Sequence, residues 1–76
     1  MIRDLDTIAL THSMKEHGLE GGDIGAVVHC FAEGNVFEVE FLTAEGKTIA
    51  LLTLDETDVR PLGGSEILHV REFTPV

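Results

Sequence analysis

The residues best suited to metal chemistry are three histidines and one cysteine. His12 and His17 stand five positions apart, and His29 directly precedes Cys30. Zinc prefers imidazole nitrogen and thiolate sulfur, so these four side chains could hold it if they met in space, which the sequence leaves open. Structural zinc sites usually contain two pairs of closely spaced ligands, and only one such pair, His12 and His17, is present. We therefore expect no metal site, two solvated loop histidines, and an outward His29 beside a buried, inert Cys30.

A second candidate for chemistry is the carboxylate pair Glu38 and Glu40. On a β-strand they share one face, about 7 Å apart. Acid–base catalysis by such a pair needs a cleft and an environment that separates the two pKa values. No spacing suggests a Ser–His–Asp triad, although a triad is spatial and sequence alone does not exclude it. We expect a solvated outer face, no catalytic residue, no cofactor and no enzymatic activity.

A glycine-rich corner must position these residues. Gly21-Gly22-Asp23-Ile24-Gly25-Ala26 combines two glycines that can reach positive φ with an aspartate that can hold the turn. Gly25 comes where a strand should begin, which predicts a bulge or a close backbone approach. The lysine and Ser/Thr of a phosphate loop are missing, and so is G-x-G-x-x-G. A structural turn is therefore expected.

Periodicity predicts an all-β chain. From Val36 to Leu42, apolar Phe37, Val39 and Phe41 alternate with the two glutamates, so they should face the core. Ile8 and Leu10 should face inward in the first strand. A nearly continuous apolar run marks the fourth strand, whose second face would be covered or await a partner. The five expected strands are Leu5–Leu10, Gly25–Phe31, Val36–Leu42, Thr48–Leu54 and Val59–Leu62.

The connections are short and polar. Ser13 and Glu16 have the spacing of a helix-capping box, which predicts one short helical turn. Asp55 should cap a 3₁₀ turn before the fifth strand. An apolar segment after Gly63-Gly64 is expected to add a sixth strand. Hairpin turns are expected at Ala32–Asn35 and Thr43–Lys47, and the sixth strand at Glu66–Phe73.

Composition limits the classes of function. The 76 residues fit one domain, with 14 acidic and five basic residues and a formal net charge of −9. This charge repels nucleic acid and anionic lipid and favours a partner with a basic surface. The single cysteine excludes an intrachain disulfide and fits a reducing cytoplasm. Neither a signal peptide nor an apolar run of membrane-spanning length is visible, so we expect a cytoplasmic protein without membrane contact.

The strand order and four segments carry a resemblance. The segments are residues 5–10, His17 to Val28, Phe37 to Phe41 and Asp58 to Leu62. Together they resemble a family of short bacterial proteins known only as a domain of unknown function, over about residues 4 to 62. The Gly-Asp-Ile-Gly-Ala-Val-Val core is also similar to the KOW motif of some ribosomal and transcription proteins. The resemblance implies an SH3-like barrel (residues 1–62, followed by a C-terminal extension at 63–76) and a bacterial cytoplasmic origin, and it supplies no catalytic residue.

Three binding functions compete. The first is an acidic protein-interaction module with a basic partner, such as the antitoxin-like or regulatory half of a two-protein system. The alternative is a KOW-like nucleic-acid-associated protein, which the scattered basic residues oppose. A reader of proline-rich peptides would need tyrosine and tryptophan, and both are absent. The basic residues are Arg3, Lys15, Lys47, Arg60 and Arg71.

The C-terminal extension bears on oligomeric state. Its apolar residues Ile67, Leu68, Val70 and Phe73 should be buried somewhere. The two glycines at Gly63-Gly64 would let it fold back on its own barrel, giving a monomer, or reach a second copy. We expect a homodimer formed through this tail, because one small barrel has little room for so much apolar surface.

Overall fold

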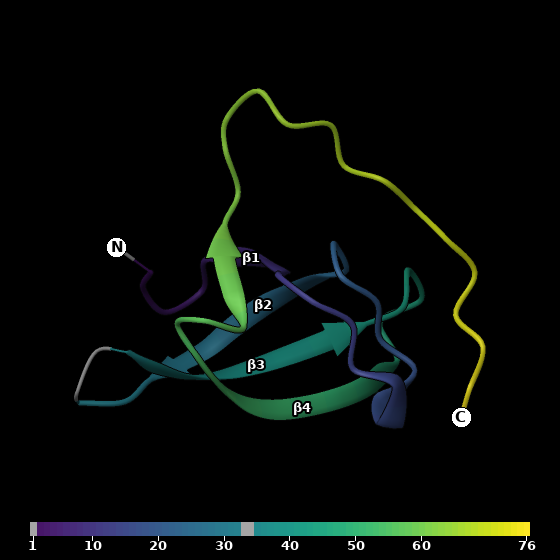
Figure 1. Cartoon of the computed structure of the whole chain (residues 1–76), viewed down its shortest axis with the longest axis horizontal. Helices are drawn as coiled ribbons and strands as arrows, with labels where there is room; N and C mark the ends of the chain where they lie inside the picture. The colour runs from purple at the N-terminus through teal and green to yellow at the C-terminus, as the bar shows by residue number, and fades with distance from the viewer. Residues whose placement is uncertain (1, 33–34) are drawn as a thin grey trace.

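The protein is built almost wholly from strands (Figure 1). The computed structural model describes residues 2–32 and 35–76. Within these residues no helix is long and apolar enough to cross a membrane. In chain order the elements are β1 (Thr7–Leu10), one 3₁₀ turn η1 (Lys15–His17), β2 (Ile24–Cys30), β3 (Val36–Leu42), β4 (Thr48–Asp55) and β5 (Val59–Pro61). The expected all-β class is confirmed.

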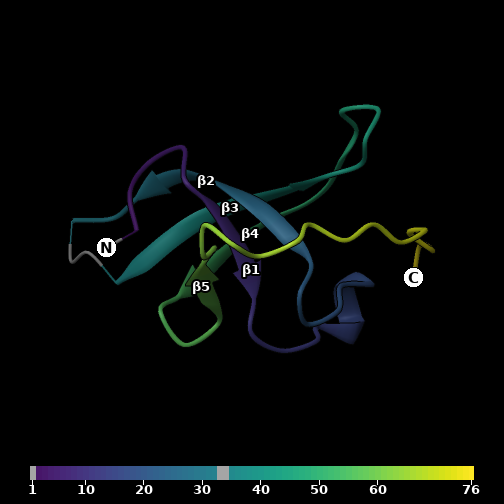
Figure 2. The ribbon, with the colours of Figure 1, turned by 90° about the horizontal axis from the view of Figure 1, so that it is seen from above.

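The strands form a single antiparallel sheet in the order β4-β3-β2-β1-β5. β1 lies between β2 and β5, so the last strand returns to the first, and the sheet curls on itself (Figure 2). This is the expected small SH3-like arrangement of about five strands. Hydrogen bonds do not close the barrel: across the described residues β4 pairs only with β3, and β5 only with β1. β4 and β5 are therefore edge strands.

The core lies on the concave side of the sheet, and β3 supplies its centre. Phe37, Val39 and Phe41 are fully buried, while Glu38 and Glu40 lie on the opposite side, as the alternation predicted. The expected inward positions of β1 are also confirmed. The remaining buried residues of the core cluster are Ile8, Leu10, Leu19, Val27, Leu54 and Val59.

The glycine-rich corner is a hydrogen-bonded turn that leads into β2. Gly22 has a φ of 93°, which a residue with a Cβ rarely adopts. The Asp23 carboxylate accepts a hydrogen bond of 2.8 Å from the Glu20 amide, and the Asp23 amide donates one of 2.9 Å to the Glu20 carbonyl. The expected structural turn is confirmed.

Gly25 marks a close approach of β2 to the core. A Cβ at this position would lie 2.8 Å from side-chain carbons of Phe41 and Val39. The irregularity in the β2–β3 ladder falls later, between Val27 and His29. Of the two expectations for Gly25, close packing is therefore confirmed, and the bulge lies elsewhere.

β1 is shorter than expected. It begins at Thr7 and not at Leu5, because a turn precedes it in which the Asp6 amide donates to the Arg3 carbonyl at 3.1 Å. Leu5 lies in this turn with a φ of 72° and is 84% exposed. Its apolar side chain suggested a strand, but the turn decides its conformation. β2 begins and ends one residue earlier than predicted, β4 ends one residue later, and β5 ends one residue earlier.

The predicted caps are correct only in part. Ser13 does not cap η1: its hydroxyl accepts a hydrogen bond of 3.0 Å from the Gly21 amide, and no side chain caps the turn at Met14. Asp55 does hold the turn after β4, because its Oδ1 accepts from the amide and hydroxyl of Thr57 at 2.8 and 2.6 Å. That segment is a hydrogen-bonded turn and not the expected 3₁₀ turn.

The β3–β4 hairpin forms at the expected turn. The Thr43 amide donates to the Lys47 carbonyl at 2.9 Å, and Gly46 has a φ of 87°. The other expected hairpin turn, Ala32–Asn35, contains residues 33–34, which lie outside the described residues.

The expected sixth strand is wrong. Residues 66–73 form no strand but an irregular segment, which arches away from the sheet and returns to the body near the C-terminus (Figure 1). Most of its apolar side chains are exposed, and Phe73 is half-buried. β5 ends at Pro61, which has no amide hydrogen to extend a ladder. Side-chain ion pairs hold the segment in place of a hydrogen-bond ladder. We call residues 63–76 the tail.

Candidate functional site

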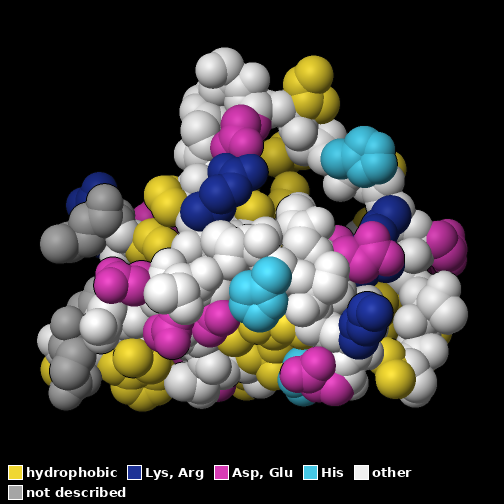
Figure 3. Space-filling view, in the orientation of Figure 1, with side chains coloured by type: hydrophobic (Ala, Val, Ile, Leu, Met, Phe, Trp, Pro, Cys, Tyr) yellow, Lys and Arg dark blue, Asp and Glu magenta, His cyan; other side chains and the backbone are white. Residues whose placement is uncertain are grey.

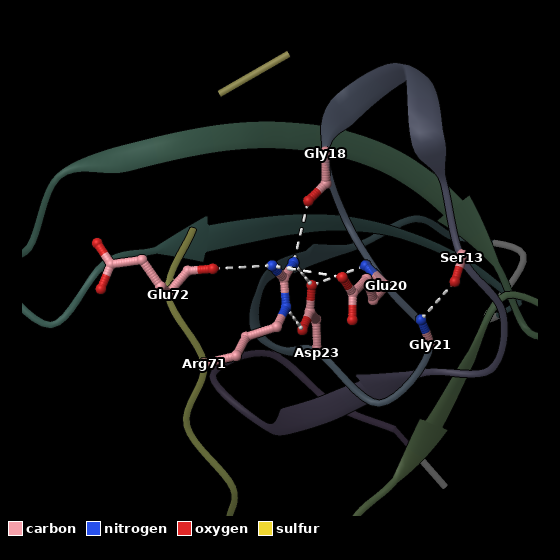
Figure 4. Close-up of polar contacts among 7 residues, drawn as sticks. All are labelled: Ser13, Gly18, Glu20, Gly21, Asp23, Arg71 and Glu72. Atoms are coloured by element: carbon pink, nitrogen blue, oxygen red, sulfur yellow. Dashed lines mark hydrogen bonds and ion pairs between the residues drawn. The ribbon is translucent and has the colours of Figure 1, made fainter. Parts of the chain in front are cut away.

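The most elaborate polar cluster joins the tail to the glycine-rich corner (Figure 4). Arg71 donates from Nε to Asp23 Oδ1 at 2.9 Å and from Nη2 to Asp23 Oδ2 at 2.5 Å. Nη2 also donates to the Gly18 carbonyl at 3.0 Å, and Nη1 lies 3.7 Å from a Glu20 carboxylate oxygen. We call these four residues the tail latch.

The Asp23 carboxylate of the tail latch is held in its charged form. Partial burial alone would raise the pKa of Asp23, but the bonds from Arg71 and the Glu20 amide outweigh it and keep that pKa below its usual value. In turn, the hydrogen bond to Asp23 raises the pKa of Arg71. Two groups locked in this way neither donate nor take up protons near neutral pH. The latch is suited to fastening and not to acid–base catalysis.

A second ion pair fixes the start of the tail. Arg60 donates from Nη1 and Nη2 to the two carboxylate oxygens of Glu66 at 2.9 and 2.7 Å. The Gly63 amide donates to the same carboxylate at 2.5 Å. The hydrogen bonds from Arg60 are the main reason why the pKa of Glu66 falls to about 2. The turn at the start of the tail is therefore pinned by a bidentate pair.

A shallow groove of about 650 Å³ lies beside the latch, between η1 and the end of the tail. Two cationic residues line it. One is Arg71, whose guanidinium is already bound by Asp23, and the other is Lys15. Phe73 and Val76 approach Gly18 so closely that a Cβ there would be 3.0 Å from each. The end of the tail therefore packs against Gly18 and forms one wall of this groove. It is lined by Ser13, Lys15, Gly18, Leu19, Glu20, Arg71, Glu72 and Thr74.

The candidate zinc ligands are spread over the molecule. His12 Nε2 lies 2.8 Å from Asp58 Oδ1, and this hydrogen bond is the main cause of a raised His12 pKa. His17 is half-buried in η1, and His29 points outward, with its ring edge-on to Phe31 at 4.9 Å. In residues 2–32 and 35–76, no three His, Cys, Asp or Glu side chains are grouped to hold a metal ion. His12 is thus tied to a carboxylate and not simply solvated, whereas the outward His29 is confirmed.

Cys30 is half-buried at the end of β2. Its thiol donates to the Ile2 carbonyl with an Sγ···O distance of 3.6 Å, and its amide donates to Asp4 Oδ1 at 2.8 Å. Burial raises the pKa of the Cys30 thiol, and the Asp4 carboxylate raises it further. Because the thiolate is the reactive form, this environment makes Cys30 a poor nucleophile and a poor metal ligand.

Glu38 and Glu40 lie on the convex side of the sheet, as predicted, and β4 orients both. The Thr53 hydroxyl donates to Glu38 Oε1 at 2.7 Å, and the Thr48 hydroxyl donates to Glu40 Oε2 at 2.6 Å. In the β3–β4 register Glu38 lies opposite Thr53, and Glu40 opposite Leu51. The two carboxylates therefore form an ordered pair beside an edge strand. We call this surface the acidic face; its residues are Glu38, Glu40, Leu42, Thr48, Leu51, Thr53 and Asp55.

Sequence reasoning missed the tail latch. Asp23 was assigned to the turn, which is correct, and Arg71 was counted only as a scattered base. The two lie 48 positions apart, and no local pattern links them. The same holds for His12 and Asp58, which are 46 positions apart. Each side chain alone is an ordinary surface residue.

No curated protein and no solved structure matches the chain. A family model does match it, over residues 4–61. That stretch contains the five strands of the described residues and the buried core but stops short of the tail. The chain therefore belongs to the family described as Domain of unknown function (DUF4926).

Proposed function

We propose that the domain is a protein-interaction module whose acidic face binds a partner with a basic surface. The observation that carries this proposal is the ordered carboxylate pair: Glu38 and Glu40, both half-buried, are oriented by threonine hydroxyls on a face whose other residues are exposed. Leu42 and Leu51, 46% and 53% exposed, flank the pair. Apolar contacts beside complementary charges are what a specific interface needs, because the charges orient the partner and apolar burial supplies affinity.

The position of this face at a sheet edge favours an extended partner segment. β4 pairs on one side only within the described residues, so its other side offers backbone donors and acceptors. An added strand would place alternate side chains over the convex surface. Lysine or arginine at those positions would meet Glu38 and Glu40, and apolar residues would meet Leu51. We infer a basic, β-prone segment as the preferred partner.

A role as the antitoxin-like or regulatory half of a bacterial two-protein system fits this interpretation. Small size and a net charge of −9 suit a chain that neutralises a basic partner. A cytoplasmic setting fits the single thiol. The nucleic-acid alternative gains no support, because Arg60 and Arg71 are held in ion pairs. We propose a binding role and no catalysis.

A titration of the ¹⁵N-labelled chain with a peptide of alternating lysine and valine tests the proposal. We expect amide shifts concentrated on β3 and β4 that saturate with peptide concentration. Glu38→Gln with Glu40→Gln should abolish these shifts. Glu45→Gln with Glu56→Gln removes the same charge from exposed turn positions and should preserve them. Equal loss in both double variants, or shifts spread evenly over the surface, would contradict a specific acidic face.

Fluorescence anisotropy with labelled single-stranded RNA and duplex DNA at low salt tests the alternative. We expect no saturable binding, because the net charge repels phosphates. Micromolar binding that weakens steeply with salt would favour the nucleic-acid function instead.

A further inference from the structure

The tail presents apolar side chains that its own chain leaves uncovered. Ile67, Leu68 and Val70 are 93%, 64% and 88% exposed. In Figure 3 the tail stands off the body at the top of the view, with hydrophobic side chains on its surface and an opening beneath it. We call residues 65–70 the arch. A cluster of exposed apolar residues on an extended segment is unusual for a surface that meets only water.

Among the residues that the structure describes, ion pairs hold the arch to the body only at its two ends. Arg60 and Glu66 pin its start, and Arg71 with Asp23 pins its end. The Gly63–Gly64 pair lies just before it, and a Cβ at Gly64 would have nothing within 4 Å. Residues 67–70, between the two fastenings, are all exposed, so they are able to take another path while the residues that bind Arg71 stay in place.

We propose that two copies of the chain exchange their tails, so that Arg71 of each copy docks on Asp23 of the other. Every copy carries the same seat, formed by Asp23, Gly18 and Glu20, so a second copy can receive the tail through the contacts seen here. Exchange of an identical element is a low-cost route to a symmetric dimer. The two arches would then cross near the two-fold axis, where Ile67, Leu68 and Val70 of one copy meet those of the other.

The balance between monomer and dimer follows from what exchange changes. The Arg71–Asp23 bonds exist in both states and cancel. The exchanged dimer gains apolar contact between the arches and loses the freedom of two separate molecules. Each copy also carries a net charge of −9, so two copies repel. Added salt screens this repulsion. Salt also weakens the Arg71–Asp23 ion pair, but it does so equally in monomer and dimer, so that effect cancels. Association should therefore strengthen as salt rises.

A pair of charge reversals tests exchange directly. In the Asp23→Arg variant, Arg71 of the tail faces a second positive charge on the body of its own chain. In the Arg71→Asp variant, the new carboxylate of the tail faces the unaltered, negatively charged Asp23. Neither variant alone should form the exchanged dimer. In a mixture, each tail meets an opposite charge on the other variant. Native mass spectrometry of the mixture should show a heterodimer and, for each variant alone, a monomer.

A variant of the arch tests the proposal even if Asp23→Arg unfolds the glycine-rich corner. Ile67→Ser with Val70→Ser changes two side chains that touch little of their own chain, so the fold should persist. Sedimentation equilibrium should show a dimer that dissociates about tenfold more readily than the unaltered chain. Leu5→Ser, at another exposed apolar position outside the tail, should leave the dissociation constant unchanged.

Three results would overturn the proposal. The first is an unaltered chain that stays monomeric at high concentration and moderate salt. The second is a dimer whose strength the arch variant does not change, or that each charge reversal forms alone. The third is an association that weakens as salt rises, because that would mean that the dimer contains ion pairs which the monomer lacks.

Discussion

Arg71 in the tail and Asp23 in the corner before β2 are joined by two hydrogen bonds, of 2.9 and 2.5 Å. The same carboxylate also accepts a bond from the Glu20 amide, so one side chain holds both a local turn and a distant segment. The corner therefore anchors the tail as well as turning the chain into β2. A substitution of Arg71 should therefore alter the environment of Asp23, and a substitution of Asp23 should alter the position of the tail.

Arg71→Gln should release the tail while the sheet stays folded. The free energy of unfolding should fall by only about 0.5–1 kcal/mol, because the pair is partly exposed to solvent. Backbone ¹⁵N relaxation should show order parameters in residues 67–76 falling below about 0.6, while Glu66 stays held by Arg60. Arg3→Gln removes the same charge at the other end of the chain and should leave the tail ordered. A tail that keeps its order in Arg71→Gln would show that other contacts hold it.

The latch should also respond to acid. The folded pKa of Asp23 lies below its usual value of 3.8, which the unfolded chain retains. Its bond to Arg71 therefore contributes fully above about pH 3.8, and this contribution is lost as pH falls through the folded value. A carboxyl-carbon NMR titration should give Asp23 a pKa below 3.8 in the unaltered chain and a higher one in Arg71→Gln. Equal values in the two chains would assign the shift to the corner alone.

The strands and the core were predictable because local pattern determines them. On β3, apolar and charged residues alternate without interruption, and only one register buries Phe37, Val39 and Phe41 together. The glycine-rich corner was predictable for a similar reason, since Gly22 has a positive φ that few other residues adopt. In both cases the deciding residues are neighbours in the chain.

The tail was not predictable in this way. Its composition is that of a strand, but the chain turns away after β5 ends at Pro61, and residues 66–73 pair with neither edge strand. What holds the tail is the contact of Arg71 with Asp23, which depends on where the whole fold places two distant loops. For the acidic face, sequence indicated that Glu38 and Glu40 point outward, but not that Thr48 and Thr53 orient them.

Phe41→Ala should cost about 3–5 kcal/mol, because it empties the centre of a small core. That is close to the whole stability of so small a domain, so much of the variant should be unfolded at 25 °C. Glu40→Gln, the adjacent outward position, should cost little. Urea unfolding followed by circular dichroism compares the two. A harmless Phe41→Ala would mean that the side chain does not fill the core.

Gly25→Ala should destabilise the sheet although it adds only one methyl group. The new carbon would lie 2.8 Å from side-chain carbons of Phe41 and Val39, which are themselves tightly packed. Overpacking of this kind costs about 1–3 kcal/mol. Gly64→Ala, with open space around the added carbon, should be neutral. Equal stability of the two variants in thermal unfolding would show that β2 can shift to accommodate the methyl.

His12 should report on the contact between the loop after β1 and the turn after β4. Its ring lies 2.8 Å from Asp58, while Thr11 bonds the same turn through its amide to the Asp58 carbonyl and through its hydroxyl to the Thr57 carbonyl. The Asp58 hydrogen bond raises the His12 pKa above its usual value of 6.5.

Because the folded pKa is the higher one, this bond stabilises the fold fully below about pH 6.5, and the effect is lost as pH rises through the folded value. A proton NMR titration of the imidazole should therefore give a pKa above 6.5. Asp58→Asn, which keeps the shape and removes the charge, should lower that pKa. A His12 that titrates at or below 6.5 in the unaltered chain would mean that solvent competes successfully for its ring and that Thr11 alone joins the two loops.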